Sequence, residues 1–350
     1  MRNFVLSVTL LIASWSQAQN IQPQQTEGID YFLPKTAIRI ALKIEKKSYA
    51  PGEYAEYAGN YLKRNDVTLT PDVNYSLQTI RLLSVGVPDS SKMFTAKMGS
   101  KYTINHVDLN EKGILLAVNT TGEDEETPKE FVAAAKPAPL NPRDYMKAEI
   151  LASGSKAKMA ELVAQDIMEI RESRNQLTRG QADFMPNDGE QLKIMLQKLD
   201  TQEKALSQLF LGTEEIDTTE VVFTFIPTQE IEKQLLFRFS EKLGMTDIDD
   251  LGGRPYYITV KDEHSIPALR VQLGDKKEKD DAGIYVNLPG KISVTILSED
   301  EPRASFGLFA AQFGKVVQLP AHFFGKKTIS RLRLNPTTGY PETFTMDTVK

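Results

Sequence analysis

Apolar and polar side chains alternate along much of the chain, which is the period of a β-strand with one buried face. Residues 38–44 show it most clearly, because branched apolar side chains occupy every second position. Further runs of this kind lie at 75–87, 93–97, 101–108 and 114–119. We therefore expect an N-terminal β module over residues 19–120. The short segment 54–58 fits either a helix or another strand.

The composition changes between residues 121 and 144. Acidic residues crowd positions 123–126, and four prolines follow with alanines among them. Such a composition is typical of an extended linker. We expect residues 121–144 to connect the first β module to the next element.

The hydrophobic spacing becomes helical over residues 145–213. Apolar side chains recur every three or four positions from 159 to 177, and Gly180 follows where a helix should stop. A second stripe of this kind covers 192–210 and is closed by Gly212. Because the connection between the stripes is short, the two helices should fold back on each other as a helical hairpin.

The strand pattern returns in residues 214–350, which we expect to form a C-terminal β module. Its apolar runs cover 221–226, 235–240, 256–260, 269–273, 284–289, 292–297, 315–319 and 329–334. The predicted fold class is α+β, mainly β, with two β-sandwich-like modules and an α-helical hairpin inserted between them.

Two stretches of the chain follow the same order of residues. Residues 28–42 and 283–296 each begin with glycine, continue through an apolar run to a proline, and then alternate. This similarity suggests an internal duplication, although strand–turn–strand patterns also recur by chance.

The first 18 residues have the pattern of a cleavable export signal. Arg2 precedes an apolar run over residues 4–15, and the small residues Ser16 and Ala18 occupy the cleavage-specifying positions. The run is shorter than the roughly 20 residues that a membrane-spanning helix needs. We expect a signal peptide over residues 1–18 and an exported protein with no transmembrane helix.

Net charge and cysteine content limit the kinds of partner and of covalent attachment that the chain can have. Lys and Arg number 42 against 47 acids, a net charge of −5 that becomes −6 when Arg2 leaves with the signal peptide. An acidic chain is a poor match for nucleic acid, which we do not expect as a partner. The chain has 0 Cys, so it can carry neither a disulfide nor the lipidated cysteine of a bacterial lipoprotein.

The sequence offers no strong catalytic or metal-binding motif. Ser155 and Lys158 have the spacing of a serine–lysine acyl-enzyme pair, but the partner motifs are missing and a helix N-cap is the preferred interpretation of Ser155. No two of the histidines His106, His264 and His322 lie at the close spacing usual for zinc ligands. We expect no catalytic residue, no cofactor and no metal.

Two kinds of surface residue remain as candidates. Aromatic residues that could contact a ligand, or simply pack, are Tyr54, Tyr57, Tyr61, Tyr256 and Tyr257. The triplets Asp217-Thr218-Thr219 and Asp347-Thr348-Val349 match an acceptor pattern of bacterial O-glycosylation and are expected in loops. About one such triplet arises by chance in a chain of this length.

Five blocks of the chain are distinctive when taken together, namely the segments 30–36, 51–58, 199–212, 238–244 and 311–320. They resemble a family of exported bacterial proteins known only as a domain of unknown function. The resemblance covers essentially the whole chain after the signal peptide. It implies a location in the Gram-negative cell envelope, and it brings no reaction, cofactor or site residue.

Three functions fit these observations. The first is a non-enzymatic structural or interaction subunit that docks to an outer-membrane or periplasmic protein, because recognition needs only a complementary surface. The second is a carbohydrate- or peptide-binding β module. The third is a hydrolase whose site is assembled from distant residues. The first is preferred, and localisation is expected to be periplasmic or outer-membrane associated.

Overall fold

The computed structural model describes residues 28–98, 102–125, 128–186, 188–266 and 283–348. Within them the chain is mainly β, with three antiparallel sheets and few helices. The expected signal peptide and the expected strand at 269–273 lie outside the described residues. None of the described helices is both long and apolar enough to cross a membrane.

The helical elements gather in the middle of the sequence. They are the 3-10 helix η1 (Ala55–Tyr57), the π-helix η2 (Ala58–Leu62), η3 (Pro142–Tyr145), α1 (Ala148–Leu151), α2 (Lys156–Arg179), α3 (Gly189–Leu211) and η4 (Ala321–Phe324). The strands are β1 (Gly28–Ala50), β2 (Asp72–Lys97), β3 (Val107–Leu109), β4 (Leu115–Val118), β5 (Thr213–Phe225), β6 (Ile231–Ser240), β7 (Gly244–Thr246), β8 (Arg254–Asp262), β9 (Tyr285–Ser298), β10 (Glu301–Gln318), β11 (Thr328–Leu334) and β12 (Pro341–Thr348).

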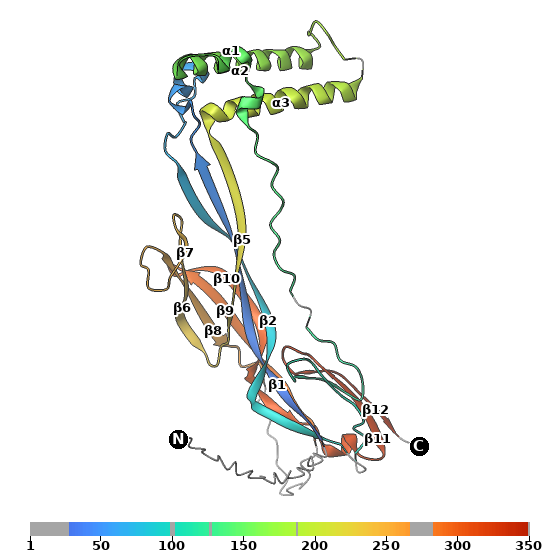
Figure 1. Cartoon of the computed structure of the whole chain (residues 1–350). Helices are drawn as coiled ribbons and strands as arrows, with labels where there is room; N and C mark the ends of the chain where they lie inside the picture. The colour runs from blue at the N-terminus through green and yellow to red at the C-terminus, as the bar shows by residue number, and fades with distance from the viewer. Residues whose placement is uncertain (1–27, 99–101, 126–127, 187, 267–282, 349–350) are drawn as a thin grey trace, which may run out of the picture.

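A long three-stranded sheet in the order β2-β1-β5 forms the backbone of the molecule (Figure 1). At roughly 3.3 Å per residue, the 23 residues of β1 span about 75 Å. β1 pairs with β2 along almost its whole length and with β5 from Ile38 to Ala50. The expected strands at 75–87 and 93–97 are therefore parts of one strand, β2.

A five-stranded sheet in the order β10-β9-β8-β6-β7 packs against the middle of the long sheet. The two sheets enclose one cluster of apolar side chains, here called the central core. Its buried members are Ile38, Ile40, Leu42, Ile44, Leu82, Phe237, Phe239, Ile258, Val260, Ile292, Val294, Ile296 and Ala310. The alternation seen at residues 38–44 thus marks the face of β1 that meets the second sheet.

A four-stranded sheet in the order β12-β11-β4-β3 lies at the end of the molecule away from α2 and α3 (Figure 1). It packs with the outer ends of β1, β2, β9 and β10 around a second cluster, here called the terminal core. Its buried members are Tyr31, Leu33, Ala96, Ile104, Val107, Leu115, Val118, Ile284, Val286, Phe324, Leu332 and Leu334.

The two similar stretches of sequence occupy matched places in these cores. The hairpins β1–β2 and β9–β10 each begin in the terminal core and continue into the central core. Both change register between the two cores, β1 between Phe32 and Pro34 and β10 between Ala310 and Lys315. A duplication predicts that the two stretches occupy equivalent places in the two cores, as they do here. The duplication itself stays a hypothesis.

The sheets do not follow the expected order of modules along the chain. β5 follows the helices in sequence but pairs with β1, and β11 pairs with β4. Strands from both sides of the helices therefore share two of the three sheets. The domain boundaries given above stay predictions about the sequence.

The structure corrects the expected strand at 101–108 and decides the conformation of the segment 54–58. Within the described residues 102–108 of the expected strand at 101–108, only Val107 and Asp108 fall in a strand, β3. Asn119 holds residues 103–106 by hydrogen bonds that replace a regular ladder. The undecided segment 54–58 is helical, in η1 and the start of η2.

Candidate functional site

The far end of the long sheet carries a helical unit, here called the helix end, made of η1, η2, η3 and α1–α3 (Figure 1). It has its own buried cluster, the helical core, with side chains from all parts of the unit. Its buried members are Tyr54, Ala58, Leu62, Ile150, Ala160, Val163, Ala164, Ile167, Ile170, Leu206, Leu209 and Phe210. The helical stripes read from the sequence supply most of these residues.

Close backbone contacts fix the helix end to the long sheet. The amide of Tyr54 donates to the carbonyl of Leu209 at 2.6 Å. A Cβ at Gly52 would lie 2.3 Å from that carbonyl oxygen, and one at Gly212 would lie 2.3 Å from the carbonyl oxygen of Ala50. Gly212 also has a positive φ of 77°, which favours glycine. A side chain at Gly52 or Gly212 would therefore clash with the backbone where the helix end meets the long sheet.

Ion pairs cross between α2 and α3. Glu203 accepts from Arg171 at 2.6 Å and from Arg174 at 2.7 Å, and Arg174 also reaches Asp200 at 2.9 Å. The hydrogen bond to Asp200 and the nearby charge of Glu203 raise the pKa of Arg174 above its usual range. The Glu203 side chain is only 15% exposed, so this network is partly shielded from water.

The helix end also leaves large apolar side chains in solvent. They are Leu151, Met168, Phe184 and Ile194, of which Phe184 is 69% exposed and Ile194 is 50% exposed. Ile194 lines a shallow hollow of about 450 Å³ on α3 together with Gln197, Lys198, Asp200 and Thr201. This surface can contact a partner without any rearrangement of the helical core.

A polar cavity of about 610 Å³ lies where the helix end meets the long sheet. Its charged lining residues are already paired, with Lys47 2.9 Å from Glu214 and Arg64 2.7 Å from Asp66. The Tyr49 hydroxyl lies 2.9 Å from the carbonyl oxygen of Thr68 and holds the cavity wall in place. Hydrogen bonding to Arg64 lowers the pKa of Asp66 to about 2.

The candidate aromatic residues fall in two separate places. Tyr54 is fully buried against Phe210, at 5.7 Å between ring centroids, so it offers no face to a ligand. Tyr57 and Tyr61 pack on the same helical core, 6.1 Å apart.

The other two candidates lie on β8. Tyr256 stacks on Phe237 at 4.5 Å, and Lys233 lies 5.3 Å from the ring of Tyr257. The five tyrosines therefore do not form one aromatic surface. Sequence reasoning missed Tyr49, since a single tyrosine within a strand carries no distinctive signal.

Ser155, His264 and His322, which the sequence offered as weak chemical candidates, each contact neighbouring protein groups. The Ser155 hydroxyl accepts from the Lys158 amide at 3.2 Å and caps α2, which confirms its expected role. His264 lies 3.2 Å from Asp262, and His322 packs edge-on against Phe323. In the described part of the chain, no three His, Cys, Asp or Glu side chains gather as metal ligands would.

The two candidate glycosylation sites lie in strands, so the expectation of loops was wrong. Thr218 is half-buried within β5, opposite Glu45 of β1. Thr348 is exposed at the last residue of β12. Alternating Thr and acidic residues fit a solvated strand face as well as a loop, which explains the error.

Comparison with known proteins identifies the family. The chain belongs to the family described as Domain of unknown function (DUF4831), whose model matches residues 27–341. This confirms the resemblance to a family of unknown function over essentially the whole chain. No curated protein and no solved structure matches the chain.

Proposed function

We propose that this protein is a non-enzymatic component of the bacterial cell envelope that presents a helical docking element to a protein partner. In this proposal the protein is exported and works in the periplasm or at the outer membrane. The finer architecture proposed is two β-sandwich-like modules, with α2 and α3 acting as a helical hairpin inserted between them.

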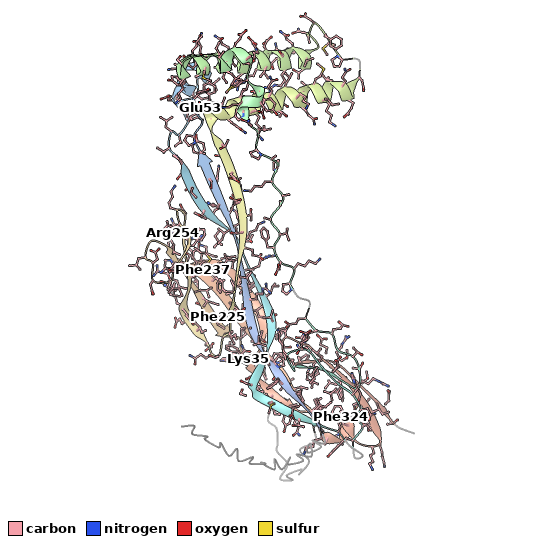
Figure 2. The ribbon with its side chains drawn as sticks, viewed as in Figure 1. Lys35, Glu53, Phe225, Phe237, Arg254 and Phe324 are labelled. Atoms are coloured by element: carbon pink, nitrogen blue, oxygen red, sulfur yellow. The ribbon has the colours of Figure 1, made fainter. Side chains whose placement is uncertain are left out.

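The separation of the helix end from the two sheet cores carries the proposal. The buried side chains of the helical core come only from residues 54–62, 150–170 and 206–210, none of which lies in a strand of the sheets. Figure 2 shows Glu53 beside the helix end and Phe324 at the opposite end of the molecule, with Phe225 and Phe237 between them. A unit held away from the body in this way suits contact with a second molecule, because the body does not block its approach.

The surface of the helix end supports a protein partner. Phe184 and Ile194 are exposed large apolar residues of the kind that anchors protein interfaces. Charged residues lie beside Ile194, as they do at the rim of an interface: Lys198 and Asp200 line the same hollow, and Asp200 pairs with Arg174 of α2.

Site-specific crosslinking in the native envelope tests the proposal. A photo-crosslinking residue would replace Ile194 in a tagged chain, and a matched variant would carry it at Phe309, an equally exposed residue of β10. We expect one protein to be crosslinked in fixed ratio from position 194 and not from position 309. The proposal fails if position 194 gives no adduct while the chain purifies alone and monomeric in mild detergent.

Export has a separate test. N-terminal sequencing of the protein from the envelope fraction should give a chain that starts at Gln19, because cleavage is expected after Ala18. An uncleaved chain in the cytoplasm would contradict the proposed location.

The polar cavity favours carbohydrate binding as a second candidate function. Its volume of about 610 Å³ is within the usual range for small-ligand sites, and its lining offers Thr70, Asn74 and Tyr49 as hydrogen-bonding groups. NMR titration of the full chain with neutral oligosaccharides checks this. Shifts confined to residues around Tyr49 that disappear in Asn74→Ala would support it, and their absence at millimolar sugar would reject it.

A further inference from the structure

The outer edge of β5 is a long strand edge that pairs with nothing in the described part of the chain. β5 pairs with β1 on one side only, over residues 213–225. Its 13 residues correspond to an edge of about 43 Å at roughly 3.3 Å per residue. An unpaired edge presents backbone N–H and C=O groups that can accept a further strand.

The linker lies beside this edge without pairing with it. Figure 1 shows residues 128–141 as an extended trace that runs alongside β5 toward η3. The described contacts are between side chains: Lys136 lies 2.8 Å from Glu215 and also bonds Asp217, and Lys43 lies 5.7 Å from the Phe131 ring. The Lys136 side chain is 42% exposed and that of Glu215 is 65% exposed, and ion pairs this open to solvent stabilise only weakly.

The linker itself is a poor strand. Pro137 directly follows Lys136, Pro139 lies two residues further on, and neither has an amide hydrogen to donate to a ladder. The linker can therefore shield the edge but cannot form a regular ladder with it. It is also the cover that an incoming strand would displace.

The strand that already pairs with β5 indicates the chemistry of the missing neighbour. In the β1–β5 register, Lys43 lies opposite Glu220 and Lys46 lies opposite Asp217. Opposite charges across a strand pair are favourable, and like charges are not. A strand suited to the outer edge should also place basic side chains opposite the acids of β5.

A second copy of this chain is a poor occupant. β5 carries four acids and no Lys or Arg, so the β5 edge of a second copy would supply no basic side chain to pair with them. The β1 strand of another copy is already paired on both sides.

We infer that the outer edge of β5 is a docking site for an extended basic segment of a partner protein, which adds as a fourth strand beside β1 and β5 after displacing the linker. This is the β-strand addition mode of peptide recognition, in which backbone bonds supply affinity and charges supply selectivity. The site differs from the helix end, so it holds or fails independently of the proposed function above.

The test uses the full chain and a labelled synthetic peptide with the sequence of residues 38–50. A control peptide carries Glu in place of Lys43, Lys46 and Lys47. Fluorescence anisotropy measures binding, and hydrogen exchange of residues 213–225 shows where the peptide lies. We expect the basic peptide to bind, the acidic peptide to fail, and exchange to slow in β5 but not in β12.

Linker variants sharpen the result. Lys136→Ala removes the ion pairs to Glu215 and Asp217, and the basic peptide should bind about fivefold tighter to it. Lys129→Ala is the matched control, because Lys129 is exposed and forms no ion pair among the described residues, and it should change nothing. The double variant Glu215→Gln/Asp217→Asn should weaken binding.

The inference is overturned if neither the native chain nor Lys136→Ala binds the basic peptide, or if the acidic peptide binds equally well. It is also overturned if binding leaves exchange in β5 unchanged. If neither peptide binds, the linker is only a shield that prevents the edge from pairing.

Discussion

The helix end and the sheet region are held together in different ways. The helix end has one core, built from side chains that are mostly close in sequence, and polar pairs cross its surface between α2 and α3. The sheet region has two cores, and each combines strands that are far apart in the chain. Side chains of β1 are buried in both of these cores. The helix end, in contrast, contacts β1 only at the last residues of that strand.

This difference predicts separate stability. A unit with its own core and a small joint should unfold without the rest of the molecule, whereas the two sheet cores share strands and should unfold together. The following predictions test that separation.

The largest effect is expected from Phe210→Ala. Removing this fully buried ring from the helical core should cost about 3–5 kcal/mol and unfold the helix end alone. Hydrogen exchange should show lost protection in α2 and α3 with β9 unchanged. Phe324→Ala is the matched variant, since it removes an equally buried ring from the terminal core and should leave the helices protected. A single transition for the whole chain in either variant would contradict the separation.

A smaller effect is expected from Glu203→Gln. The substitution weakens the pairs with both Arg171 and Arg174, and partial exposure of the arginines limits the loss to about 1 kcal/mol of helix-end stability. Thermal melting followed by helix circular dichroism measures it. Glu161→Gln is the control, because its pair with Lys158 at 3.1 Å is exposed on one helix, and its melt should stay near that of the native chain. Equal losses in both variants would show that the cross-helix network has no special role.

The smallest effect concerns acid. The folded pKa of Asp66 is lowered to about 2 by Arg64, below the ordinary carboxyl value of about 4. The stabilisation that the charged Asp66 gives to the loop beside the cavity is therefore complete above pH 4. It is lost as the pH falls toward 2. NMR titration of the Asp66 carboxyl checks this, and a midpoint near pH 4 would show that the pair with Arg64 does not persist in solution.

The helix end was largely predictable from local sequence. Helical spacing needs only neighbouring residues, and Gly180, with φ 66°, ends α2 where the pattern stops. The segment 54–58 was ambiguous because its conformation depends on burial of Tyr54 against Phe210, a contact made across the fold.

The sheets were predictable as strands but not as partners. The alternation at residues 38–44 correctly marks one buried face of β1, and nothing local reveals that β5 joins its other edge. The same limit applies to the candidate sites. Tyr256 was a candidate for contact with a ligand or for packing, and only the structure shows that its ring stacks on Phe237 of a neighbouring strand. The pairing of strands that are far apart in the chain depends on tertiary packing. Composition and hydrophobic periodicity carry no information about that packing.

The continuous strand β1 has a mechanical consequence. It runs from the terminal core to the helix end, and its hydrogen bonds to β2 and β5 lie across the strand direction. A pull applied between the two ends of the molecule would load these bonds side by side in shear, so that many must break at once. Tension would therefore pass along the long sheet, and the helices at its tip should give way before the strands do.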